Sequence, residues 1–324
     1  PEAFAALPAA DYVRATYDIT IPDDRPWFPE KMPATPKVTP ATAPKLRWTR
    51  QTLFVKDADP AGPTWLLLRD TAAGGQPTLW QFWSLSEKIG AARQAGEPAF
   101  LAEKPGKTIL PGRELPRSDQ YTALGQLGVD LEFFVAAPAD TPRATMRYGG
   151  KTLHIEEYQD LLQLRRAGDG AYYVAIFPRA AGTAAPAFAS LDDGKIIKVS
   201  GEGWTDYALL AHEPVTAGGD DVAFAGTAGA VAARAAGVTL TLAASGEVRR
   251  GAYALSAPSA ASLQITPRSA ALLLPDGGAG GEFTVQLPDG WTLQAPPAGV
   301  TLTAEGPRSR IRVPAGIRRV VLGP

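Results

Sequence analysis

Cysteine is absent from this sequence of 324 residues, and histidine occurs only twice. Without thiolates the chain has neither a disulfide framework nor a cysteine zinc site. Neither histidine belongs to an H-x-H or H-E-x-x-H pattern, and the glycine-rich stretches Ala225–Ala230 and Asp276–Gly281 do not continue into a G-K-[ST] phosphate loop. We therefore predict no metal and no cofactor. The lack of cysteine is compatible with the periplasm or the extracellular space, which is where we expect the protein.

A charge excess of either sign is also missing. The 32 basic and 33 acidic residues leave a net charge of −1, and the basic residues are scattered along the chain. Nucleic-acid binding needs a concentrated basic face, so we do not expect it. No run reaches the roughly 18 to 20 apolar residues that a membrane-spanning helix needs, so no membrane span is predicted.

What the sequence does contain is a series of short extended runs with turn residues between them. The stretch from Arg47 to Ser86 organises the rest and holds three such runs. Asp-Gly, Gly-Gly and Pro-Gly turns separate further runs at the spacing typical of all-β proteins. The pattern predicts an all-β fold, a large antiparallel β-sandwich. Its clearest strands are Gln51–Lys56, Trp65–Arg69, Thr78–Leu85, Val129–Val135, Ala171–Phe177, Lys195–Val199 and Thr205–Leu210.

Composition divides the chain into three parts. Residues 1–46 are interpreted as an N-terminal strap, with a short Ala-rich helix at Glu2–Ala10 and seven prolines between positions 21 and 44 that favour extended backbone. Residues 47–257 form the predicted sandwich. Residues 258–324 shift toward Ala, Gly and Pro. We favour a small appended β-domain there over extra strands on the main sandwich.

Several runs in the right order resemble the β-sandwich portion of the heparinase II/III-like polysaccharide lyases. They are RQTLFVKD, GGQPTLWQFWSLSEKI, GVDLEFFVAAP, GDGAYYVAIFPR, LDDGKIIKV and TDYALL, and they cover roughly residues 47–257. The resemblance implies a supersandwich-like fold and β-elimination on a uronate-containing glycan. It also implies that an α/α toroid, preceding this region or on a separate chain, supplies the usual catalytic Tyr and His.

Catalytic candidates within this sequence are few. His154 lies beside Glu156, Glu157 and Tyr158, and His154 with Tyr158 could form an acid–base pair. A histidine in a polar strand end is the competing interpretation, and we prefer it. In the resembling family a histidine often lies in the aromatic strand occupied here by Trp80 to Trp83, where this sequence has none. The main catalytic residues are therefore expected outside this chain.

Aromatic and basic residues lie close together in the organising stretch. Most tryptophans in strands pack into a core. Trp80 and Trp83 are three positions apart, so a regular strand places them on opposite faces, one in the core and one free to stack on a sugar ring. We predict contact with an acidic glycan at Arg47, Trp48, Arg50, Trp80 and Trp83.

Three functions remain open at this point. The first is the β-sandwich part of a heparinase II/III-like lyase, with an acidic polysaccharide as partner and its catalytic residues elsewhere. The second is a non-catalytic carbohydrate-binding or surface-assembly module. The third, a lyase that acts alone, is least favoured because histidine is so scarce. The chain begins at Pro1 without Met or a signal-peptide pattern, so we expect a processed or truncated piece.

Overall fold

The computed structural model describes residues 1–324 except 21–44, 92–109, 126, 140 and 153–154. The described residues form 26 strands in three antiparallel sheets, and no helix occurs among them. The prediction of an all-β fold built from large antiparallel sheets is therefore confirmed. The described part of the chain contains no helix with the length and hydrophobicity to cross a membrane.

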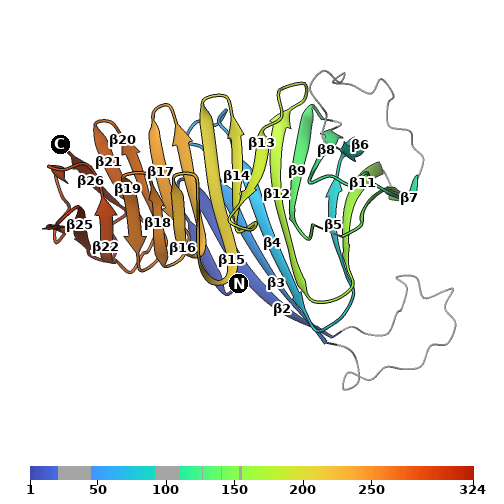
Figure 1. The fold of residues 1–324 in the computed structure, drawn as a ribbon, viewed down its shortest axis with the longest axis horizontal. Coiled ribbons are helices and arrows are strands. Elements are labelled where there is room, and N and C mark those ends of the chain that lie inside the picture. The colour runs from blue at the N-terminus through green and yellow to red at the C-terminus, as the bar shows by residue number, and fades with distance from the viewer. Residues whose placement is uncertain (21–44, 92–109, 126, 140, 153–154) are drawn as a thin grey trace.

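An eight-stranded sheet occupies the middle of the molecule (Figure 1). Strands β3, β4, β12 and β9 lie at its centre, and their side chains alternate between its two faces. In sheet order its members are β1 (Ala3–Ala6), β2 (Ala10–Thr20), β3 (Lys45–Val55), β4 (Trp65–Ala73), β12 (Gly170–Ala180), β9 (Val129–Ala137), β8 (Gln120–Gly125) and β6 (Ser86–Ala91).

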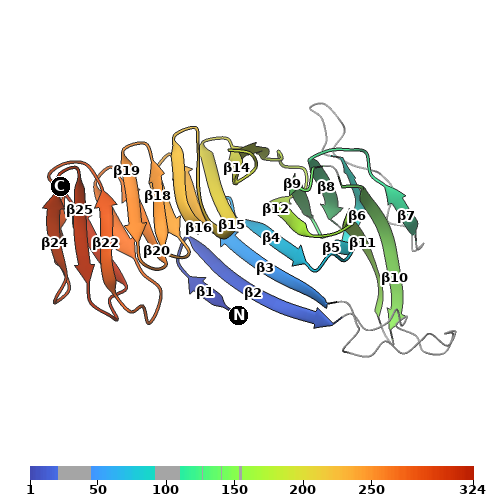
Figure 2. The same ribbon diagram turned by 60° about the horizontal axis from the view of Figure 1, so that its bottom comes forward.

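A four-stranded sheet packs against one face of the eight-stranded sheet. Its strands β10 and β11 form a long hairpin, which projects downward in the view of Figure 2. Apolar residues of both sheets, Trp80 and Leu162 among them, form one buried cluster with Tyr172 and Val174 of β12. In sheet order the strands are β5 (Thr78–Ser84), β11 (Ile155–Arg166), β10 (Arg143–Thr152) and β7 (Leu110–Glu114).

A fourteen-stranded sheet packs against the opposite face. Its four strands nearest the eight-stranded sheet are β13 (Ala187–Leu191), β14 (Ile196–Gly201), β15 (Trp204–Gly219) and β16 (Val222–Arg234). The long strand β16 pairs with β17 along one half and with β18 along the other, so the sheet divides into two arms. One arm contains β17 (Gly237–Leu242), β20 (Ala261–Thr266), β21 (Ser269–Leu273), β26 (Arg319–Gly323) and β23 (Thr292–Leu293). The other contains β18 (Gly246–Arg250), β19 (Tyr253–Ala257), β22 (Gly281–Gln286), β25 (Arg308–Val313) and β24 (Thr301–Glu305).

Three hydrophobic cores follow one another along the long axis of the molecule (Figure 1). Strand β12 shows why the sequence permits this arrangement. Its run of apolar residues places Tyr172 and Val174 in the core beside the four-stranded sheet, while Tyr173 and Ala175 enter the core beside the fourteen-stranded sheet. A continuous apolar run rather than a half-polar one is what a strand buried on both faces requires.

Two parts of the predicted domain organisation are wrong. Ala3–Ala6 and Ala10–Thr20 are strands β1 and β2 of the eight-stranded sheet, not a helix and strap, because pairing of β2 with β3 outweighs the helix preference of alanine. The favoured break at 258 is absent, since β20 pairs with β17 and β22 pairs with β19. The C-terminal strands extend the main sheet, and both arms share one core.

Side chains of the eight-stranded sheet hold an irregular part of β15. Pairing between β15 and β16 shifts register between Leu210 and Val215. Tyr173 accepts a hydrogen bond from Leu210 N, at 3.1 Å, and Arg69, Gln51 and Arg14 donate to the carbonyls of residues 210, 211 and 212. These contacts satisfy buried backbone groups that the ladder leaves unpaired.

Alkaline pH is expected to weaken the packing of β15 on the eight-stranded sheet, because it ionises the Tyr173 hydroxyl. Burial raises the pKa of its hydroxyl to about 12, above the unfolded value of about 10. The folded state therefore holds this proton more tightly, and its contribution is lost as pH rises from about 10 through 12. In urea unfolding, the wild type should lose about 2 to 3 kcal/mol more than Tyr173→Phe across this window. A Tyr17→Phe control should follow the wild type, and equal losses in Tyr173→Phe and wild type would contradict the assignment.

Candidate functional site: an aromatic face on the eight-stranded sheet

The four-stranded sheet leaves part of the eight-stranded sheet uncovered at β2 and β3. Tyr17 and Trp48 lie directly opposite each other on these two strands, so their rings share one face of the sheet. Tyr17 is 59% exposed, and the neighbouring Ile19 is 40% exposed. Arg50, two positions after Trp48, projects from the same face. We call Tyr17, Ile19, Trp48 and Arg50 the aromatic face.

The position of Trp48 is set by the alternation of β3. Thr49, Gln51 and Leu53 are buried and turn toward the fourteen-stranded sheet, so Trp48 and Arg50 turn the other way. The Trp48 ring stacks on Tyr172 of β12, with centroids 6.0 Å apart and planes 23° apart. One ring face is therefore held by the core. The half-buried side chain leaves the remainder of its surface at the edge of the four-stranded sheet.

Arg50 is held rigidly by a buried carboxylate. Its Nε and Nη2 atoms donate to the two oxygens of Asp70, at 2.8 and 2.6 Å, and Asp70 is fully buried. These hydrogen bonds raise the pKa of Arg50, with the charge of Asp70 as a further cause. Arg50 itself is 48% exposed in its side chain. The two-bond geometry leaves Nη1 directed away from Asp70, where it can donate to a ligand.

Arg47 does not belong to the aromatic face. It lies an odd number of positions from Arg50 and therefore projects from the opposite face, where its Nε and Nη2 donate to Asp18 at 2.8 and 3.0 Å. The hydrogen bond from Arg47 lowers the pKa of the Asp18 carboxyl. Arg47 therefore lies on the other side of the sheet from Trp48 and Arg50, because residues three apart in a strand project from opposite faces, and its contact with a glycan stays a prediction.

The two tryptophans of β5 lie on opposite faces of the four-stranded sheet. Trp80 is 2% exposed and packs in the core beside Phe82, so it offers no surface to a glycan, and its predicted ligand contact is wrong. Trp83 is 45% exposed on the outer face. That face is different from the aromatic face, and contact of Trp83 with a glycan stays a prediction.

The predicted acid–base pair is not placed by the structure. His154 lies outside the described residues. Tyr158 belongs to β11 and pairs with Gly149, but its side chain is not among those described. The described residues contain no cluster of three or more metal-ligating side chains.

Sequence reasoning missed Tyr17, because β2 was assigned to a strap rather than to the sheet. The alternation of Tyr12, Arg14 and Thr16 against Val13, Ala15 and Tyr17 is the signal that predicts a strand there. It also missed Arg166, whose guanidinium donates to the carbonyls of Asp169 and Ala171 beside Tyr172. Burial raises the pKa of Tyr172, and the hydrogen bond with Thr78 and the charge of Arg166 oppose part of that rise.

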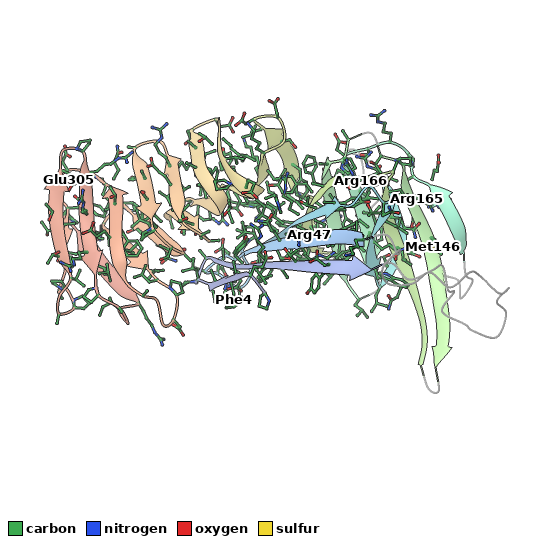
Figure 3. The ribbon with its side chains drawn as sticks, turned by 90° about the horizontal axis from the view of Figure 1, so that it is seen from below. Phe4, Arg47, Met146, Arg165, Arg166 and Glu305 are labelled. Carbon is green, nitrogen blue, oxygen red and sulfur yellow. The ribbon has the colours of Figure 1, made fainter. Side chains whose placement is uncertain are left out.

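The end of the sheet that carries the aromatic face is electropositive. Figure 3 places Arg165 and Arg166 together at the end of β11, with Arg47 on β3. Five cations and three carboxylates of described residues lie at this end, so their summed charge is +2. The cations are Lys45, Arg47, Arg50, Arg165 and Arg166, and the carboxylates are Asp18, Asp70 and Asp169.

Comparison with known proteins gives a fold similarity only. The structure is similar to that of a Paenibacillus xanthan lyase, with a TM-score of 0.42 and 11% sequence identity. The match covers 87% of this chain and 28% of that one, so the chain spans less than a third of that lyase. No protein-family model matches the sequence. No curated protein matches it either.

Proposed function

We propose that this chain is the β-sandwich part of a heparinase II/III-like polysaccharide lyase, and that its aromatic face binds an acidic, uronate-containing glycan. The observation that carries the proposal is the pairing of two partly exposed rings, Tyr17 and Trp48, with the fixed guanidinium of Arg50. Flat rings stack on the apolar faces of sugars, and guanidinium groups bind carboxylates through paired, charge-assisted hydrogen bonds.

The charge of this end of the molecule supports an acidic rather than a neutral glycan. Asp70 neutralises Arg50 without occupying its Nη1 group, and the two-charge excess nearby attracts anions. Because Asp70 is buried and uses both oxygens on Arg50, the guanidinium is oriented before a ligand arrives. Preorganisation of this kind reduces the entropy lost on binding.

The catalytic groups of β-elimination are assigned to another part of the enzyme. His212, the histidine that the structure describes, belongs to β15, and its carbonyl accepts a hydrogen bond from Arg14. Arg14 projects from the face of the eight-stranded sheet opposite to Trp48. His212 therefore cannot reach a sugar bound on the aromatic face. The same geometry would also serve the alternative function, a non-catalytic carbohydrate-binding module. For either function, the proposed location is the periplasm or the outside of the cell.

Two measurements on the full chain distinguish glycan binding from glycan cleavage. Alginate, heparan sulfate and polygalacturonate are titrated calorimetrically, with dextran as a neutral polymer and fully methyl-esterified polygalacturonate as a matched uncharged one. We expect at least one uronate polymer to bind, weakened by salt, and no unsaturated uronate to appear in ultraviolet absorbance. Dextran binding as tight as that of the uronate polymers would overturn the binding proposal. So would the absence of binding by every polymer. Accumulation of unsaturated products would overturn the assignment of catalysis to another region.

A further inference from the structure

A cleft lies at the other end of the same strands, and the charge around it is of the opposite sign. Its volume is about 760 Å³, within the range of ligand-binding clefts. Residues 60–64 between β3 and β4, the end of β12, residues 183–186 and the turn between β14 and β15 surround it. Trp48 lies near the start of β3, whereas this cleft follows its end, so the two sites are separate.

The walls of the cleft are apolar and stiff. Four proline rings, Pro60, Pro63, Pro178 and Pro186, line it together with Trp204. The Trp204 ring is parallel to Phe177 within 7° at 5.8 Å, and the Arg234 guanidinium lies over the ring at 5.6 Å. Since both partners hold the indole, the ring is fixed in position. The walls therefore suit an aliphatic chain rather than a second stacked ring.

Carboxylates outnumber cations around these walls. Glu202 is exposed in the cleft lining, and no described residue forms an ion pair with it. Arg179, which also lines the cleft, is shared by Asp130 and Glu132, and behind Trp204 the guanidinium of Arg234 is shared by Asp57 and Asp206. Five carboxylates against two guanidinium groups leave three negative charges. A uronate glycan would be repelled here, whereas a cation is attracted.

We propose that this cleft binds a lysine- or arginine-bearing peptide segment of a partner protein. The aliphatic stem of the basic residue packs against the proline rings, and its charged head pairs with Glu202. The volume is larger than one side chain needs, so the flanking residues of the segment also enter. This inference is independent of the proposed function, because it uses other residues, the opposite charge and the other end of the sheet.

Pentapeptides of proline and alanine with one central variable residue provide the probe. Lysine, arginine, norleucine and glutamate are compared at the centre, with spermine as a cation that has no peptide backbone. By calorimetry on the full chain, the lysine or arginine peptide should bind about tenfold tighter than the norleucine peptide. Equal affinity for the basic and norleucine peptides would overturn the proposal. So would spermine binding that matches or exceeds that of the basic peptides.

Variants of the protein test the location of the site. Glu202→Gln should weaken the basic peptide about fivefold and leave the norleucine peptide unchanged. Ala185→Trp, at an exposed lining position, should block both peptides without unfolding the chain. Glu213→Gln, an exposed carboxylate on β15 outside the lining, is the matched control and should bind like the wild type. Unchanged affinity in both Glu202→Gln and Ala185→Trp would place the peptide elsewhere and refute the proposal.

Discussion

Replacing Arg234 by methionine is expected to lower the free energy of unfolding by about 3 to 5 kcal/mol, the largest effect of any single change considered. Arg234 lies between Asp206 and Asp57, donating from Nη1 and Nη2 to the first and from Nε to the second. Asp206 is fully buried, and Trp65 Nε1 donates to it at 3.0 Å. These four residues join the eight-stranded sheet to the fourteen-stranded sheet.

The cost arises from the carboxylate that the substitution leaves behind. Burial raises the pKa of Asp206, while the hydrogen bond and charge of Arg234 oppose that rise. Without Arg234, Asp206 keeps one indole donor for a buried charge. Adding Asp206→Asn to Arg234→Met should therefore recover part of the loss, which a simple packing defect would not.

Chemical unfolding of the full chain measures this effect. Arg268→Met, an exposed arginine in the turn after β20, is the matched control and should change stability by no more than about 0.5 kcal/mol. A loss below about 1 kcal/mol in Arg234→Met, or no recovery in the double variant, would show that the ion cluster does not hold the two sheets together.

Loss of the rings of the aromatic face should abolish most glycan affinity. Tyr17→Ala and Trp48→Ala are each expected to weaken binding of the uronate polymer about tenfold, because each removes a stacking surface of about 1 to 2 kcal/mol. Tyr17 is the cleaner test, since its ring is 59% exposed. Trp48 also stacks on Tyr172, so its variant must first be shown to be folded.

Phe4→Ala provides the matched control for these variants. Phe4 is an aromatic residue on the edge strand β1 of the same sheet, 71% exposed, and Figure 3 shows it away from Arg47. Its removal should leave affinity unchanged. A similar loss in Phe4→Ala and Tyr17→Ala would indicate non-specific adhesion to exposed rings and would count against a defined site.

Positioning of Arg50 by Asp70 gives a further expected result. Asp70→Asn removes the charge that orients the guanidinium, so affinity should fall although the local net charge becomes more positive. An affinity that rises instead would mean that charge alone, not the fixed geometry of Arg50, attracts the glycan.

Local patterns were sufficient to predict the central strands. The runs around Leu53, Leu67 and Val174 are apolar, rich in aliphatic and aromatic residues and bounded by turns, and all three lie in the eight-stranded sheet. The opposite faces of Trp80 and Trp83 follow from the two-residue period of a strand. The same rule places Arg47 and Arg50 on opposite faces of β3.

Long-range pairing is what the sequence could not supply. Nothing local to Ala3–Ala6 indicates that β2 will pair with β3 across the intervening segment, so the alanine content favoured a helix. Likewise, the change in composition near Pro258 does not reveal that β20 will pair with β17. Tyr17 belongs to the candidate site only because the pairing of β2 with β3 brings it beside Trp48.

The structure of the chain with a bound uronate oligosaccharide, determined by crystallography, tests the central claim most directly. We predict sugar rings over Tyr17 and Trp48, with a carboxylate accepting a hydrogen bond from Arg50 Nη1. A sugar seated in the proline-lined cleft, or on the outer face of the four-stranded sheet with Trp48 bare, would contradict the account.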